Sequence, residues 1–276
     1  MSTLKPYKGD YYLWEYIPSI GASVVFLLFF LAATCYHSWK IWQTKARFCI
    51  AFCIGGIFEL IGYIARAVCY NNTADLIPYC IQSVFILLGP VLFAASVYMA
   101  LGKVIRSTGG EKYSLIRVQW LTKTFVASDI VSFLVQGTGS GMMAMGGSMA
   151  GTAKGITIAG LVIQLLMFSL FIFTSIAFER RMDRFSYGES SPSWKRHLYS
   201  LYAISALIMI RSVFRVIEYA MGQKGYLLSH EWTMYIFDSL LMLGVMVIWA
   251  FWHPGSLHGG VRPDSGMLPM QEFEEK

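Results

Sequence analysis

The chain has 276 residues, of which 56% are hydrophobic and only 14% are charged, and its mean hydropathy is +0.53. An ordinary soluble domain carries about 25% charged residues, so this composition excludes that class. The formal net charge of +6 has to be sorted along the chain before it can be interpreted.

Apolar stretches of roughly 20 residues, long enough to cross a bilayer as a helix, follow one another through the sequence. They nearly use up the chain, so we predict a single domain over residues 1–276: an all-α integral membrane bundle of seven transmembrane helices. Pro90 interrupts the third stretch and is expected to kink it. The predicted spans are Ile17–Trp39, Phe48–Val68, Tyr79–Leu101, Trp120–Met143, Ile156–Phe178, Leu198–Tyr219 and Thr233–Trp252.

The basic residues indicate which side of the membrane each connection faces. Fifteen of the 22 lie in or next to the connections after the first, third and fifth spans, or in the tail. Because cytosolic loops are enriched in Lys and Arg, the N-terminus is predicted outside and residues 253–276 form a short cytosolic tail. The same clusters are ordinary topology signals, so we predict no nucleic-acid partner.

Two cysteines and a sequon flank the connection between the second and third spans, on the predicted outer side. Cys69 and Cys80 could form a disulfide there or remain free, since spacing alone does not establish the geometry. Between them, Asn71-Asn72-Thr73 is a candidate N-glycosylation site.

Ionisable residues lie inside several spans, although a charge at the bilayer centre costs about 2.5–3.5 kcal/mol. In the second span Glu59 and Arg66 share one helix face, in the fourth Asp129 and Gln136 do so, and the sixth span repeats the pattern. Counted along the helices, most of this polarity falls in the outer half of the membrane. The acids and arginines within the spans are Glu59, Asp129, Glu218 and Asp238, and Arg66, Arg211 and Arg215.

These groups allow two interpretations: a closed network of ion pairs that fixes helix register, or a polar chamber that holds a lipid head group. The formal charges of the four acids and three arginines sum to −1, so one acid could be protonated or the chamber could accept a cationic amine. We therefore predict that Glu59→Gln and Asp129→Asn impair the handling of cationic amphiphiles more than neutral ones. The candidate substrate-binding residues are Glu59, Tyr63, Arg66, Gln82, Asp129, Gln136, Arg211, Arg215, Glu218 and Asp238.

The connection between the fourth and fifth spans, residues 137–155, is rich in Gly, Met and Ser. A flexible outer loop is one interpretation, and a mobile lid over the chamber is another.

The sequence lacks the motifs of P-loop nucleotide hydrolysis and of serine-hydrolase catalysis. The sequence has no G-x-x-x-x-G-K-[ST] phosphate loop and no G-x-S-x-G nucleophile elbow. The histidines show no metal-ligand spacing, so no metal, cofactor or catalytic residue is predicted.

Motifs in five spans resemble those of the fungal lipid-translocating exporter family, which is associated with aminocholesterol resistance, export of sphingoid long-chain bases and, in one branch, porphyrin uptake. The resemblance covers nearly the whole chain. It rests on Phe58–Arg66, Gln82-Ser83 through Pro90, Ala94–Met99, Asp129–Phe133 with Gln136, Gly137, Gly139 and Gly141, and Arg211–Tyr219 with His230-Glu231 and Asp238.

The resemblance implies a non-enzymatic protein of the plasma membrane, or of an endomembrane, that moves amphipathic lipids such as sphingoid bases or sterol-like cationic amphiphiles. Its partners would be membrane lipids or amphipathic small molecules. A seven-span lipid sensor is the alternative. An intramembrane terpene cyclase, using Glu59 and Asp238 as acids, is a third reading, which neighbouring arginines disfavour because they stabilise ionised carboxylates.

Overall fold

The computed structural model describes Trp14 and residues 16–71, 73–145, 150–185, 193–222 and 225–252, and these residues form helices and turns with no strand. The predicted tail, 253–276, lies outside them. The helices are α1 Ile20–Thr44, α2 Ile50–Cys69, α3 Leu76–Ser107, α4 Val118–Met145, α5 Ala150–Phe185, α6 Ser193–Met221, α7 Tyr226–Ser229, α8 Glu231–Met234, and α9 Leu241–Phe251, with short 3₁₀ turns at Arg47–Cys49 and Gly110–Tyr113. Between α8 and α9, Tyr235–Leu240 form a π-helical turn.

Six helical segments of the described chain are long and apolar enough to cross a membrane: α1, α2, α3, most of α5 and of α6, and Glu231–Phe251. They correspond to six of the seven predicted spans. The remaining one, α4, is a helix of 28 residues but does not reach the apolarity of the others. Its second half is rich in Gly, Ser and Thr, which lowers its hydropathy.

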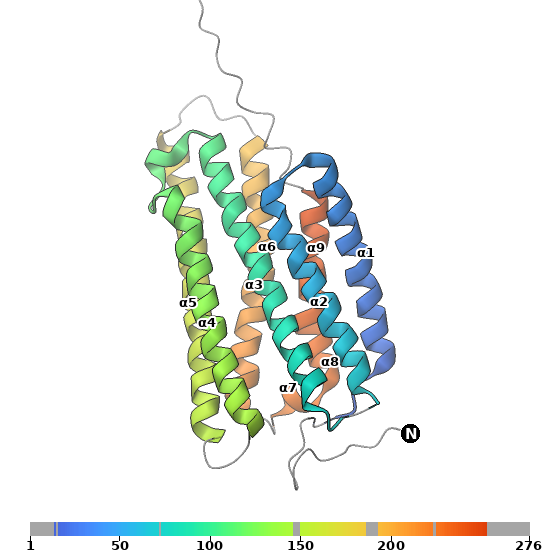
Figure 1. Cartoon of the computed structure of the whole chain (residues 1–276). Coiled ribbons are helices and arrows are strands. Elements are labelled where there is room, and N and C mark those ends of the chain that lie inside the picture. Colours follow the sequence, from blue (N-terminus) through green and yellow to red (C-terminus); the bar gives the residue numbers. More distant parts are fainter. Residues whose placement is uncertain are drawn as a thin grey trace, which may run out of the picture.

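The long helices run roughly parallel or antiparallel along one common direction (Figure 1). The ends that join α1 to α2, α3 to α4 and α5 to α6 gather at one end of the bundle, drawn at the top. The α2–α3 connection, the end of α4, the start of α5, and α7 and α8 lie at the other end, called here the outer end after the prediction from charge. The basic connections identified from the sequence therefore share one end.

Polarity in this bundle is arranged as in a membrane protein. Large apolar side chains such as Leu28, Leu166 and Phe173 are more than half exposed, whereas Glu59, Asp129 and Arg66 are at most 1% exposed. In water such an arrangement would leave a large apolar surface exposed to solvent. In a bilayer that surface contacts lipid, and the charged groups stay inside the protein. This is a multi-pass membrane protein.

The segment expected to be a loop between the fourth and fifth spans is largely helical, so the expectation of a flexible loop was wrong over most of its length. Gly137, Gly139 and Gly141 lie in α4, and Gly151 and Gly155 lie in α5; Gly146 and Gly147 lie outside the described residues. The glycines let two helices touch. A Cβ on Gly139 would come 2.7 Å from the Ala153 carbonyl oxygen, and one on Gly160 would come 2.9 Å from the Ser132 carbonyl oxygen.

Candidate polar chamber

At the outer end a cavity of about 140 Å³ opens between α2, α3, α6 and the last span. Its lining includes four aromatic residues, Trp14, Tyr16, Tyr79 and Tyr219. Five of the predicted site residues line it: Arg66, Gln82, Arg215, Glu218 and Asp238. The polar chamber expected from the sequence therefore has a counterpart in the structure, which we call the outer cavity.

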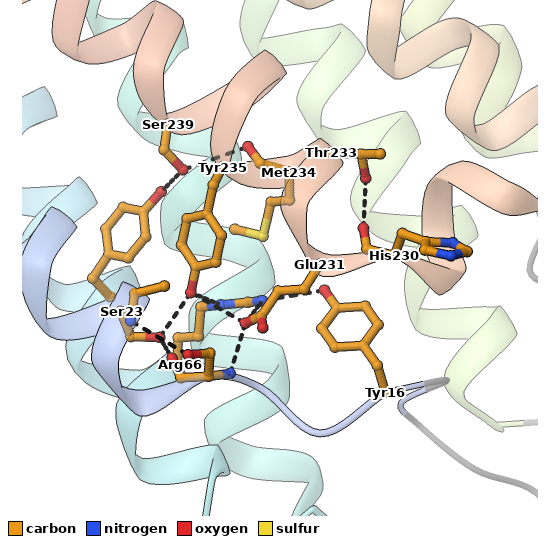
Figure 2. A network of polar contacts seen from close by, with 12 residues as sticks. Tyr16, Ser23, Arg66, His230, Glu231, Thr233, Met234, Tyr235 and Ser239 are labelled. Atoms are coloured by element: carbon orange, nitrogen blue, oxygen red, sulfur yellow. Dashed lines mark hydrogen bonds and ion pairs between the residues drawn. The ribbon is translucent and has the colours of Figure 1, made fainter.

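Arg66 is held at the rim of the outer cavity by three chain segments that meet there (Figure 2). Its Nη2 donates to Glu231 Oε1 at 2.7 Å and to the Tyr16 hydroxyl at 3.1 Å, and its Nε donates to the Tyr235 hydroxyl at 3.0 Å. The backbone N–H of Ser19, the N-cap of α1, donates to the same Glu231 oxygen at 2.8 Å. The start of α1, the end of α2 and the start of α8 are thus tied through one carboxylate.

Aromatic rings complete the environment of Arg66, whose side chain has no exposed surface. Its guanidinium carbon lies 5.4 Å from the ring centre of Trp14, 5.7 Å from Tyr16 and 5.2 Å from Tyr235. Cation–π attraction offsets part of the cost of burying the charge. Neither Glu231 nor the aromatics were among the predicted site residues. The signal for Glu231 was present, since a buried Arg66 requires an acid and the segment His230-Glu231 belongs to the resemblance.

Deeper in the bundle Arg211 forms an ion pair with Asp238 Oδ1. Its Nη2 also donates to the carbonyl oxygen of Ile86 at 3.3 Å. Pro90, four residues further along α3, has no N–H to offer that carbonyl, so the proline creates the acceptor that Arg211 uses. Asp238 lies in the π-helical turn, an irregularity often found at functional sites.

The third arginine is paired within its own helix. Arg215 Nη1 lies 2.8 Å from Glu218 Oε2, one turn further along α6, and its guanidinium carbon lies 5.2 Å from the Tyr219 ring centre. In the described part of the bundle each buried arginine thus has one acid: Arg66 with Glu231, Arg211 with Asp238 and Arg215 with Glu218.

Two of the predicted acids, Glu59 and Asp129, have no arginine partner among the described residues. Asp129 accepts a hydrogen bond of 2.9 Å from the Tyr98 hydroxyl at Oδ2. Glu59 Oε1 is buried without a hydrogen-bond donor. Tyr63, one turn beyond Glu59 on α2, directs its hydroxyl to Ser239 instead of into the outer cavity.

The α4 residues lie apart from the outer cavity, so the expectation of one pocket shared by four helices holds for α2, α6 and the last span only. Gln136 donates to Gln164 of α5 at 2.9 Å. Asp129 faces a void of about 10 Å³, which Arg211, Pro90 and Tyr98 also line. The void has the size of one water molecule, and Asp129 of α4 and Arg211 of α6 both line it.

The structure describes both predicted cysteines and the first residue of the predicted glycosylation site. Cys69 is a buried free thiol and Cys80 an exposed one, so the structure holds no disulfide between them. Asn71 is exposed in the turn after α2, while Asn72 lies outside the described residues. Among the described residues no group of three or more His, Cys, Asp or Glu side chains is placed to hold a metal ion.

The model of the RTA1-like protein family matches residues 52–260 of this chain. The protein belongs to the RTA1-like family.

Among RTA1-like relatives in Saccharomyces cerevisiae, Protoporphyrin uptake protein 1 is 32% identical, with 92% of this chain and 94% of the relative aligned. Protein RTA1 is 32% identical over 87% of this chain and 84% of its own length. The Sphingoid long-chain base transporter RSB1 is 26% identical over 87% of this chain and 72% of its own. No solved structure matches this RTA1-like chain.

Proposed function

We propose that this RTA1-like protein moves amphipathic lipids with a cationic, hydroxylated head group, such as sphingoid bases, across the membrane, with the head group bound in the outer cavity. One observation carries the proposal. Four side chains that line the cavity each hold a buried polar atom without a protein partner: the donors Arg66 Nη1 and Arg215 Nε, and the acceptors Gln82 Oε1 and Asp238 Oδ2. Unpaired buried polar atoms are costly, so such a set indicates a ligand or water.

The two kinds of unpaired atom fit an amino alcohol. The acceptors on Gln82 and Asp238 suit an ammonium group, and the donors on Arg66 and Arg215 suit hydroxyl oxygens or a phosphate. A cavity of about 140 Å³ holds a small head group, since one water occupies about 30 Å³ in the liquid. An acyl chain does not fit there and would remain between the helices and the lipid. The name of the relative RSB1, a sphingoid long-chain base transporter, supports this substrate class.

The proposal includes a seven-span, single-domain topology with the outer cavity facing away from the cytosol, in the plasma membrane. At 1.5 Å per residue, the 28 residues of α4 extend about 42 Å, more than a bilayer core requires. An N-terminal epitope tag accessible to antibody on intact cells, with a C-terminal tag accessible only after permeabilisation, would support this orientation.

We assign the protein no catalytic role. The uptake and transport functions in its relatives' names support that view. A cyclase acid would need an apolar, aromatic-lined pocket, whereas Asp238 lies against Arg211 and a polar cavity. Without a phosphate loop, movement would run downhill or be coupled to a gradient.

Purified protein in liposomes tests the proposal through the transbilayer movement of a fluorescent sphingoid base and of its neutral N-acyl analogue. The wild type should accelerate the cationic lipid more than the neutral one. Gln82→Leu should reduce movement of the cationic lipid about tenfold or more, because a hydrogen bond to a charged group contributes roughly 1.5–3 kcal/mol.

Gln164→Leu is the matched control, since it removes a half-buried amide that pairs with Gln136 and does not line the outer cavity. Equal movement in empty and protein-containing vesicles would overturn the proposal. Binding of the lipid without movement would favour a sensor.

A further inference from the structure

Glu59 is a buried acid that takes part in none of the ion pairs with Arg66, Arg211 and Arg215. Its side chain is 1% exposed, and its Oε1 has no donor. Each arginine of the cluster is already paired with another acid. An unpaired carboxylate ion in such a place costs so much free energy that the group takes up a proton instead.

The charged neighbours of Glu59 come from two elements besides its own helix. Tyr63, one turn beyond Glu59, hydrogen-bonds to Ser239, the residue after Asp238 in the π-helical turn. Arg211 of α6, which binds Asp238, also reaches the Ile86 carbonyl on α3, one turn before Gly89. The Arg215–Glu218 pair on α6 lies next in this network, and on α2 itself Tyr63 and Arg66 follow at one and two turns. The α3 surface that packs on the Glu59 carboxyl is Gly89, which brings no charge.

Packing around Glu59 favours a proton over a metal cation. A methyl group placed on Gly89 would come within 2.6 Å of Oε1. A bound calcium or magnesium ion needs about six oxygen ligands around it, and that side of the carboxyl has no room for them.

Asp238 connects this buried group with the outer cavity. Its Oδ1 accepts from Arg211, while its Oδ2 has no donor. The same residue lines the outer cavity, where the proposed function places an ammonium group. Asp238 therefore lines the outer cavity and, through Arg211 and the neighbouring Ser239, is tied to the α2–α3 contact that buries Glu59.

We propose that Glu59 and Asp238 share one proton with Arg211 as their fixed counter-ion, and that the arrival of a cationic head group at Asp238 releases it, so that the protein exchanges a proton for a lipid cation. This inference rests on the proposed function. In the empty protein the triad of two carboxyls and one guanidinium carries one proton and a net charge of zero. When the ammonium binds, the carboxyl O–H bond breaks, the proton leaves to water, and the ammonium replaces its charge.

The driven reaction is tested in liposomes with a permanently charged, N-trimethylated sphingoid base, which cannot cross as a neutral amine. The membrane potential is clamped with potassium and valinomycin, and a pH difference of one unit is imposed. The lipid cation should accumulate in the leaflet on the acidic side, approaching the roughly tenfold ratio that one pH unit supports for a one-to-one exchange.

Glu59→Gln should abolish this pH-driven accumulation, whereas Gln164→Leu should retain it. If movement of the lipid cation by the wild type does not depend on the pH difference, the proposed exchange is wrong and the proposed function still stands. No movement of any lipid overturns the proposed function.

Two measurements examine the proton directly without transport. The first is the infrared carbonyl band of a protonated carboxyl in purified protein at neutral pH, which should weaken in Glu59→Gln and persist in Glu218→Gln. The second uses wild-type protein in weakly buffered detergent solution, where adding the trimethylated lipid should release about one proton per lipid bound, as the exchange of one charge for another requires. An unchanged infrared band or no proton release overturns the inference.

Discussion

Arg211 on α6 donates a hydrogen bond to the carbonyl oxygen of Ile86 on α3, the acceptor that Pro90 deprives of its helical donor. The same guanidinium binds Asp238 in the π-helical turn. One side chain thereby joins the irregular points of two helices. Pro90 leaves the Ile86 carbonyl without its helical donor, and the π-helical turn contributes the side-chain carboxylate of Asp238, so Arg211 satisfies a backbone group of one helix and a side chain of the other.

Removing Arg211 should destabilise the protein strongly. Arg211→Leu leaves the Asp238 carboxylate and the Ile86 carbonyl buried without their donor, so we expect a loss of about 3–5 kcal/mol in the free energy of unfolding. The midpoint of thermal unfolding in detergent measures the effect. The double variant Arg211→Leu with Asp238→Leu should recover at least half of it, since both charges are gone. A double variant no more stable than the single one would contradict the assigned ion pair.

The carboxylate of Glu231 should stabilise the outer end. Glu231→Gln removes the acid that neutralises the fully buried Arg66 and accepts from Ser19, so we expect a loss of about 1.5–3 kcal/mol. Asp183→Asn is the matched control, because Asp183 and Lys195 form an ion pair in which both side chains are more than a third exposed. That change should leave the unfolding midpoint nearly unchanged, because solvent screens an exposed ion pair. Similar unfolding midpoints for the two variants would argue against the role of Glu231.

The contact between α4 and α5 should depend on Gly139. Gly139→Ala would bring a methyl group to 2.7 Å from the Ala153 carbonyl oxygen, forcing the helices apart at a cost of about 1–3 kcal/mol. Gly137→Ala, two residues earlier, meets nothing within 4 Å and should be neutral or slightly stabilising, because Ala favours helix over Gly. Thermal unfolding of both variants checks this. Equal midpoints would mean that α4 and α5 do not approach as closely as described.

The cysteines should react as five free thiols. Alkylation of native protein in detergent should modify the two exposed cysteines and spare the buried three until the protein is denatured. The total after denaturation should be the same with and without prior reduction. A count that rises by two on reduction would show a disulfide in the native protein. The exposed residues are Cys35 and Cys80, and the buried ones are Cys49, Cys53 and Cys69.

The sequence by itself determined the helices and the depth of the polar residues. Runs of about 20 apolar residues in a chain with 14% charge have few alternatives to membrane helices. The fixed rise of a helix then placed Arg66, Arg215 and Asp238 near one end. The Gly-rich stretch misled, because a composition typical of loops also suits close helix contact, as Gly139 shows.

Only the tertiary structure decided which charges pair. Helix periodicity shows which residues share a face, but not which face meets which neighbour. The sequence indicated that a buried Arg66 needs an acid, but only packing showed that this acid is Glu231, 165 residues away. Packing also took Asp129 and Gln136 away from the outer cavity and left Glu59 without a direct ion-pair partner. The physical reason is that an ion pair depends on contacts of a few ångströms between helices, and these are set by how the whole bundle fits together.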